Sequence, residues 1–121
     1  MLFRSDGDGD LVTQTYTVNV TGADDAPTLG SVTTGSVAEV DQSSSTTDQN
    51  LTGTLVGADV DVETLTYGIT GGTDNGDGTV SKSGTYGTLT VNTSSGAYVY
   101  VKNAAAIEAL DDGETAQDNF T

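Results

Sequence analysis

The chain contains neither cysteine nor histidine. Disulfide scaffolding, thiolate zinc sites and imidazole bases are therefore excluded, together with the usual cysteine and serine triads. Any metal would have to be bound by oxygen atoms, which are the ligands that calcium takes in proteins.

Basic residues are almost as scarce. Only Arg4, Lys82 and Lys102 oppose 18 acidic residues, so that the formal net charge is −15 over 121 residues. Nucleic acid and anionic membrane surfaces are excluded as partners, because binding them depends on lysine and arginine. A charge of this size opposes compaction unless counter-ions bind. Divalent cations are therefore the expected partner.

Long apolar runs and tryptophan are also missing. No segment is long enough to span a bilayer, and we expect no membrane insertion. Paired carboxylates do serve glycosidases, but a sugar cleft needs aromatic walls, and aromatic residues make up only 6% of the chain. We expect a protein that is not an enzyme.

The residues that are present favour β-structure, because valine, leucine, isoleucine and tyrosine alternate with threonine. Turn signals separate about seven short strands, which predicts an all-β, immunoglobulin-like sandwich. Only 104–110 has helical composition, and it predicts one short connector helix. We expect a tight turn at 5–10, loops at 42–50 and 71–78, and strands at 11–20, 29–40, 51–57, 65–69, 87–91 and 97–101, with a further strand beginning at 115–121.

The N-terminal part divides at a junction. Alternation in 11–20 places Tyr16, Val18 and Val20 on one face and predicts a half-buried strand. Residues 21–27 then break the pattern with paired acids and the single proline, which is typical of an inter-domain junction.

Several spaced motifs resemble the VCBS repeat. The hairpin phrase is Gly87-Thr88-Leu89-Thr90-Val91-Asn92 followed by Gly96-Ala97-Tyr98-Val99-Tyr100. It is followed by Ala109-Leu110-Asp111-Asp112-Gly113-Glu114-Thr115 and by Asp118-Asn119-Phe120-Thr121. The usual ending of such a repeat stands at the front of the chain, as Ser5–Gly9, Thr17–Val20 and Asp24–Pro27, with Asp24 in place of the commoner asparagine.

The resemblance implies a module of a large bacterial surface or secreted adhesin of the RTX type, similar in layout to cadherins. Its partners would be adjacent repeats of the same parent chain, and its location extracellular. In this reading 1–22 is the last strand of a preceding repeat, either loosely ordered or exchanged into another copy. Residues 23–27 are the inter-repeat junction, and 28–121 form a VCBS-like sandwich without its last strand.

Acidic clusters fall at both predicted ends of the sandwich. In an up-down sandwich the second strand returns to the junction, so Asp59 and Asp61 should lie beside Asp24 and Asp25. Cadherin-like modules have a similar D-x-D corner, which Asp59, Asp61 and Glu63 match. At the opposite end, Glu39 and Asp41 at the end of the first strand are expected to meet Asp111, Asp112 and Glu114 in a second acidic group.

Spaced acids on loops meet the demand of calcium for several oxygens, and the group at the junction predicts low-affinity calcium binding. The second group would serve a following junction, and we expect it to bind calcium weakly or not at all. The alternative is that each acid is a solvated turn residue, since aspartate favours turns. We expect a calcium-stiffened extender. A module that binds glycan or a host protein through 42–50 or 71–78 and a plain folding unit without metal are the other hypotheses.

Overall fold

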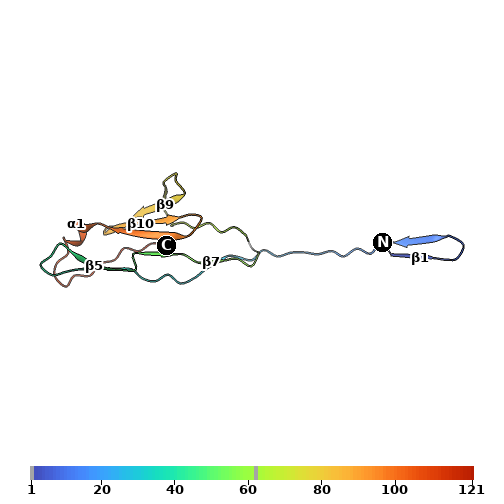
Figure 1. The fold of residues 1–121 in the computed structure, drawn as a ribbon, viewed down its shortest axis with the longest axis horizontal. Helices are drawn as coiled ribbons and strands as arrows, with labels where there is room; N and C mark the ends of the chain where they lie inside the picture. The colour runs from blue at the N-terminus through green and yellow to red at the C-terminus, as the bar shows by residue number, and fades with distance from the viewer. Residues whose placement is uncertain (1, 62) are drawn as a thin grey trace.

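The computed structural model describes residues 2–61 and 63–121, and it is nearly all β (Figure 1). A two-layered, sandwich-like body contains most of the strands and the one short helix of the described part. A separate N-terminal hairpin stands away from this body at the end of an extended segment (Figure 1). No helix in 2–61 or 63–121 is long and apolar enough to cross a membrane.

The N-terminal hairpin consists of β1 (Leu2–Ser5) and β2 (Leu11–Gln14), which pair antiparallel. The carboxylate of Asp6 closes the turn by accepting the amides of Asp8 and Asp10, each at 3.2 Å. The tight turn predicted at 5–10 is thus confirmed.

The larger sheet consists, in spatial order, of β6 (Thr52–Thr54), β11 (Ala97–Lys102), β10 (Gly87–Asn92), β9 (Thr79–Ser83) and β8 (Thr73–Asp74). Its centre is the predicted hairpin, in which Val91 lies opposite Tyr98.

The first and second long segments of the body run antiparallel beside each other. β3 (Thr28–Leu29) pairs with β7 (Gly57–Ala58), and β4 (Ser36–Glu39) pairs with β5 (Thr46–Gln49). Because β6 lies between β5 and β7 in the chain and pairs with β11, this pair of segments is joined to the larger sheet.

Two of the predicted loops contain strands. β5 falls inside 42–50, although Thr46–Gln49 has no apolar residue, because its ladder with β4 and not burial holds it in place. In 71–78 the loop is a narrow hairpin: β8 pairs with β9, and the Asp74 carboxylate accepts the amide of Gly76 at 2.8 Å. Polar strands of this kind carry no alternation that a pattern search would find.

Other predicted elements are shorter than expected. α1 (Ala104–Ile107) covers only the first half of 104–110; the Asn103 side chain caps its start, and a turn follows. Residues 65–69 are not in a ladder, but their exposure alternates as in a strand, and the Tyr67 amide donates to the Thr93 carbonyl at 2.8 Å. No strand is assigned in 115–121.

The hydrophobic core is small. Among the described residues only Ile69, Val91 and Ile107 are buried apolar side chains. The half-buried position predicted for 11–20 is wrong: only its first four residues form a strand, and every residue is exposed, because no second layer faces this segment.

The carboxylate of Asp118 connects three parts of the body. One oxygen accepts the Thr85 amide at 2.8 Å; the other accepts the Tyr86 amide at 2.9 Å and the Tyr100 hydroxyl at 2.8 Å. The tight turn between β9 and β10 can approach this carboxylate because Gly84 has no side chain: a Cβ there would overlap Asp118. Asp118 therefore ties the C-terminal segment to the larger sheet.

Phe120 adds an apolar contact to this connection, with its ring edge-to-face on Tyr100 at 6.1 Å between centroids. Partial burial raises the pKa of Tyr100, and the hydrogen bond to Asp118 and its charge raise it further. Burial also acts to raise the pKa of Asp118, but the hydrogen bonds from Tyr100 and the turn amides outweigh it and lower that pKa below its usual range.

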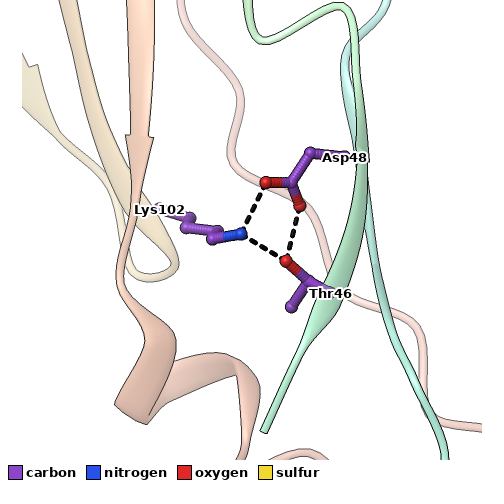
Figure 2. A network of polar contacts seen from close by, with 3 residues as sticks. All are labelled: Thr46, Asp48 and Lys102. Carbon is purple, nitrogen blue, oxygen red and sulfur yellow. Dashed lines mark hydrogen bonds and ion pairs between the residues drawn. The ribbon is translucent and has the colours of Figure 1, made fainter.

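A second polar connection joins the two layers. Figure 2 shows Lys102 on β11 reaching across to Thr46 and Asp48 on β5, with the Lys102 ammonium 2.5 Å from the Asp48 carboxylate. The hydrogen bond from Lys102, followed by that from Thr46, lowers the pKa of Asp48. Both charged side chains are about one-third exposed, at 32% and 33%, so the pair contributes little more than an exposed ion pair.

Replacing Asp118 with asparagine should destabilise the body. An amide keeps one acceptor oxygen but cannot accept all three hydrogen bonds, and hydrogen bonds to a charged group contribute about 1.5–3 kcal/mol. We expect Asp118→Asn to lower the free energy of unfolding by about 2 kcal/mol in urea denaturation. Asp41→Asn, which removes one exposed carboxylate, is the control and should change stability by less than about 0.5 kcal/mol. Equal stabilities of the two variants would contradict the role of Asp118.

The same carboxylate should make stability depend on pH. Because the pKa of Asp118 is lower in the folded state than in the unfolded chain, its contribution is complete above the unfolded pKa of about 3.9. The contribution is lost as the pH falls through the folded pKa. We expect the wild-type protein to lose its stability advantage over Asp118→Asn in this acidic range, as measured by urea midpoints at successive pH values. A difference that does not change with pH would contradict this assignment.

Candidate functional site

The acidic junction and the acidic corner meet at one end of the body. The amide of Asp25 donates to the Asp61 carboxylate at 2.8 Å. The amide of Asp61 in turn donates to Asp59 at 2.8 Å, so the side chain of Asp59 shapes the corner locally. The predicted neighbourhood of residues 24–25 and 59–61 is therefore present, at the end of the body that faces the extended segment (Figure 1).

A hollow of about 460 Å³ lies between these two segments. We call it the junction hollow. Four of its lining residues are acidic, and the rest are small, apolar or hydroxyl-bearing. The lining consists of Asp24, Asp25, Ala26, Pro27, Asp59, Glu63, Thr64, Leu65 and Thr66.

None of the described residues that line the junction hollow is basic. Lys102 is paired with Asp48 between the two layers, and the Lys82 ammonium donates to the Thr70 carbonyl at 2.7 Å. The carboxylates of the hollow thus repel one another without a protein cation to compensate, and at physiological ionic strength such repulsion extends over about 8 Å.

The donor chemistry of the junction hollow fits a hard cation. Its carboxylates and the Thr64 and Thr66 hydroxyls are oxygen ligands, as calcium requires. The side chains do not form a finished coordination shell: within 2–61 and 63–121 no three acidic side chains converge closely enough to hold an ion. One oxygen of Asp61 is already bonded to the Asp25 amide. That Asp24, Asp25, Asp59, Asp61 and Glu63 bind a cation stays a prediction.

The second predicted acidic group is less connected. α1 and the turn between β4 and β5 lie at the same end of the body (Figure 1). Glu39 is exposed at the end of β4, and no hydrogen bond of the described residues joins it to 111–114. The Glu114 carboxylate turns back to accept the Asp111 amide at 3.1 Å. Metal binding by Glu39, Asp111, Asp112 and Glu114 stays a prediction. No contact among the described residues brings Glu39 together with the other three acids.

Two further acids act as turn residues. Asp74 accepts the Gly76 amide, and Asp77 accepts both the amide and the hydroxyl of Thr79 at 3.0 and 2.6 Å. The hydroxyl bond, followed by the amide bond, lowers the pKa of Asp77. Asp74 and Asp77 therefore act as turn residues, positions that aspartate favours.

Sequence reasoning gave no role to Asp118 or to the contact of Lys102 with β5. The spacing Gly84-x-x-Gly87 indicates a tight turn, and the amides of such a turn need an acceptor. This spacing is the one sequence feature that points to a partner such as Asp118, which accepts the amides of Thr85 and Tyr86. No family model, curated protein or solved structure matches the chain. Function must therefore be inferred from the residues and their arrangement.

The contact between Asp25 and Asp61 gives a direct test of the junction geometry. Asp61→Ala removes the acceptor of the Asp25 amide, and that amide should then exchange with solvent deuterium at close to the rate of an unstructured chain. Asp61→Asn keeps an acceptor oxygen and should preserve part of the protection. Residue-resolved hydrogen exchange by NMR measures both. An unchanged Asp25 rate in Asp61→Ala would show that the junction is not held by this bond.

Proposed function

We propose that this protein is a structural, non-enzymatic module of a tandem array on the bacterial cell surface or in a secreted adhesin, stiffened by calcium at its junction. The module would be of the VCBS type, with an immunoglobulin-like arrangement of strands. The observation that carries the proposal is the junction hollow, where acids from the connecting segment and from the body line one space without a basic residue.

The proposed role follows from the electrostatics of the junction. Residues 15–27 form an extended connection with no ladder partner among the described residues, so this connection alone cannot fix the angle between two modules. A calcium ion supplies positive charge and binds several oxygens at once. Held by Asp24, Asp25, Asp59 and Glu63, it would offset their repulsion and tie the connection to the body. Asp61 positions the backbone of the junction through the Asp25 amide.

An extracellular location suits this chemistry. Extracellular calcium modules work with dissociation constants of about 10⁻⁴–10⁻³ M, for which a site of a few exposed carboxylates is sufficient. The net charge of −15 also favours solubility and weak association between bodies, as a long extended array requires. The partners of the module are then the adjacent repeats of the same parent chain.

The proposal predicts that calcium stabilises the folded protein. A ligand that binds only the folded state at ten times its dissociation constant adds about 1.4 kcal/mol, which raises the melting temperature by a few degrees. We expect such a rise when millimolar calcium replaces chelator, with sodium chloride at matched ionic strength giving a smaller effect. Thermal unfolding followed by circular dichroism measures the shift.

Paired variants locate the effect. Asp59→Asn with Asp61→Asn removes two carboxylates of the junction and should abolish the calcium shift. Asp74→Asn with Asp77→Asn removes two carboxylates from the β8–β9 turn, where asparagine can still accept the Gly76 and Thr79 amides, and should keep it. No shift in the wild-type protein, or an equal loss in both pairs, would contradict the proposal. Glycan-array binding that survives in the Asp59, Asp61 pair would instead favour an adhesive module.

A further inference from the structure

In the segment 11–20, a short strand that belongs only to the N-terminal hairpin continues into extended chain. Leu11–Gln14 pairs on one side only, with β1, and residues 15–20 have no ladder partner in the described chain. An isolated two-stranded hairpin is marginally stable in water. Yet Tyr16, Val18 and Val20 expose 76%, 63% and 87% of their surface. Three apolar side chains thus alternate along one face of an extended backbone, and the amides and carbonyls of 15–20 have no ladder partner among the described residues.

Charge distinguishes this segment from most of the chain. Residues 11–23 contain no charged side chain, in a protein with 18 acidic residues. A strand with carboxylates would be repelled by any surface of this molecule, whereas 11–20 can approach it without electrostatic cost. The segment is therefore compatible with a surface of the same acidic chain.

The body has a sheet edge that is also unpaired and uncharged. All hydrogen bonds of residues 28–39 run to 46–58, so the opposite side of this first segment is an unpaired sheet edge within the described structure. Residues 26–38 are uncharged as well. Leu29 and Val32 on this edge expose 60% and 53% of their surface. Such an edge accepts an added strand by main-chain hydrogen bonds, with apolar side chains providing specificity.

Residues 15–27, which connect the N-terminal hairpin to the body, lead away from this edge of the same chain (Figure 1). The Asp25 amide is fixed to Asp61, and Pro27 restricts the backbone directly before β3. Figure 1 shows the extended segment leaving the end of the body and carrying the hairpin outward. The strand is thereby presented to another molecule and not to its own sheet.

We propose that 11–20 of one copy adds as a strand to the outer edge of 28–38 in a second copy of this chain. The two surfaces in this contact are different, so each copy still offers an unused edge or strand after one contact has formed. Association is therefore expected to continue beyond a pair, unless two copies exchange strands reciprocally. The contact buries the face of Tyr16, Val18 and Val20 and needs no metal.

Sedimentation velocity over a range of concentrations tests the association. The wild-type protein should show a weight-average mass that rises with concentration to at least about twice that of the monomer. Val18→Asp with Val20→Asp puts charge on the proposed contact face and should remain monomeric. Thr17→Asp with Asn19→Asp adds the same charge on the opposite face and should weaken association less. All four positions are exposed, so neither pair should disturb the fold of the body.

Crosslinking identifies the acceptor edge, because the chain has no cysteine of its own. Thr17→Cys protein is mixed with Thr33→Cys protein, and in parallel with Thr73→Cys protein, whose cysteine lies on the β8 edge at the far side of the sheet. A short bis-maleimide should join 17 to 33 far more than 17 to 73. A monomer at every concentration, equal effects of the two charge pairs, or equal crosslinking to both edges would overturn the proposal.

Discussion

The shortage of positive charge constrains every polar contact in this molecule. With three basic residues against 18 acidic ones, ion pairs cannot stabilise most carboxylates. Lys102 forms an ion pair with Asp48 across the two layers. Several other aspartates accept backbone amides instead: Asp118 binds the turn before β10, Asp61 binds the junction, and Asp6 closes the N-terminal turn. Amide donors carry no formal charge, so these contacts hold the chain together while its net charge stays strongly negative. The remaining negative charge is balanced by ions from solution, and the calcium ion proposed for the junction hollow would balance part of it.

A small core follows from the same composition. Ile69, Val91 and Ile107 are the buried apolar residues of the described chain, so ladders and polar connections contribute much of the fixed geometry. A sandwich normally closes its apolar interior with strands on every edge. Here the first segment of the body keeps Leu29 and Val32 exposed, while residues 15–20, which have no ladder partner among the described residues, extend from the other end of the junction. The uncovered edge and residues 15–20 are both uncharged, so no repulsion separates them, and they are complementary in hydrogen-bonding capacity. That complementarity is what the proposed strand addition uses.

The sequence predicted the features that depend on local pattern. The β10–β11 hairpin alternates regularly around a turn rich in serine and glycine, and the acids at 59 and 61 follow a strand that returns to the junction. β5 and β9 were missed, because Thr46–Gln49 and Thr79–Ser83 contain almost no apolar residues and are fixed by their neighbours in the sheet. The role of Asp118 was missed for a related reason: its partners lie more than thirty residues away at Thr85 and Tyr86. A half-buried face for 11–20 was wrong, because alternation reports the capacity to be buried and not the presence of a covering layer.

The junction links the two proposals physically. Strand addition between copies costs less when the strand is already held in an extended, outward direction, because less conformational entropy is lost on binding. The bond from the Asp25 amide to Asp61 provides part of that order. A cation in the junction hollow would add to it by removing the repulsion between Asp24, Asp25, Asp59 and Glu63. Strand addition can proceed without the ion, but an ordered junction would strengthen it, so the same four carboxylates would set both the stiffness of the connection and the direction in which 11–20 is presented.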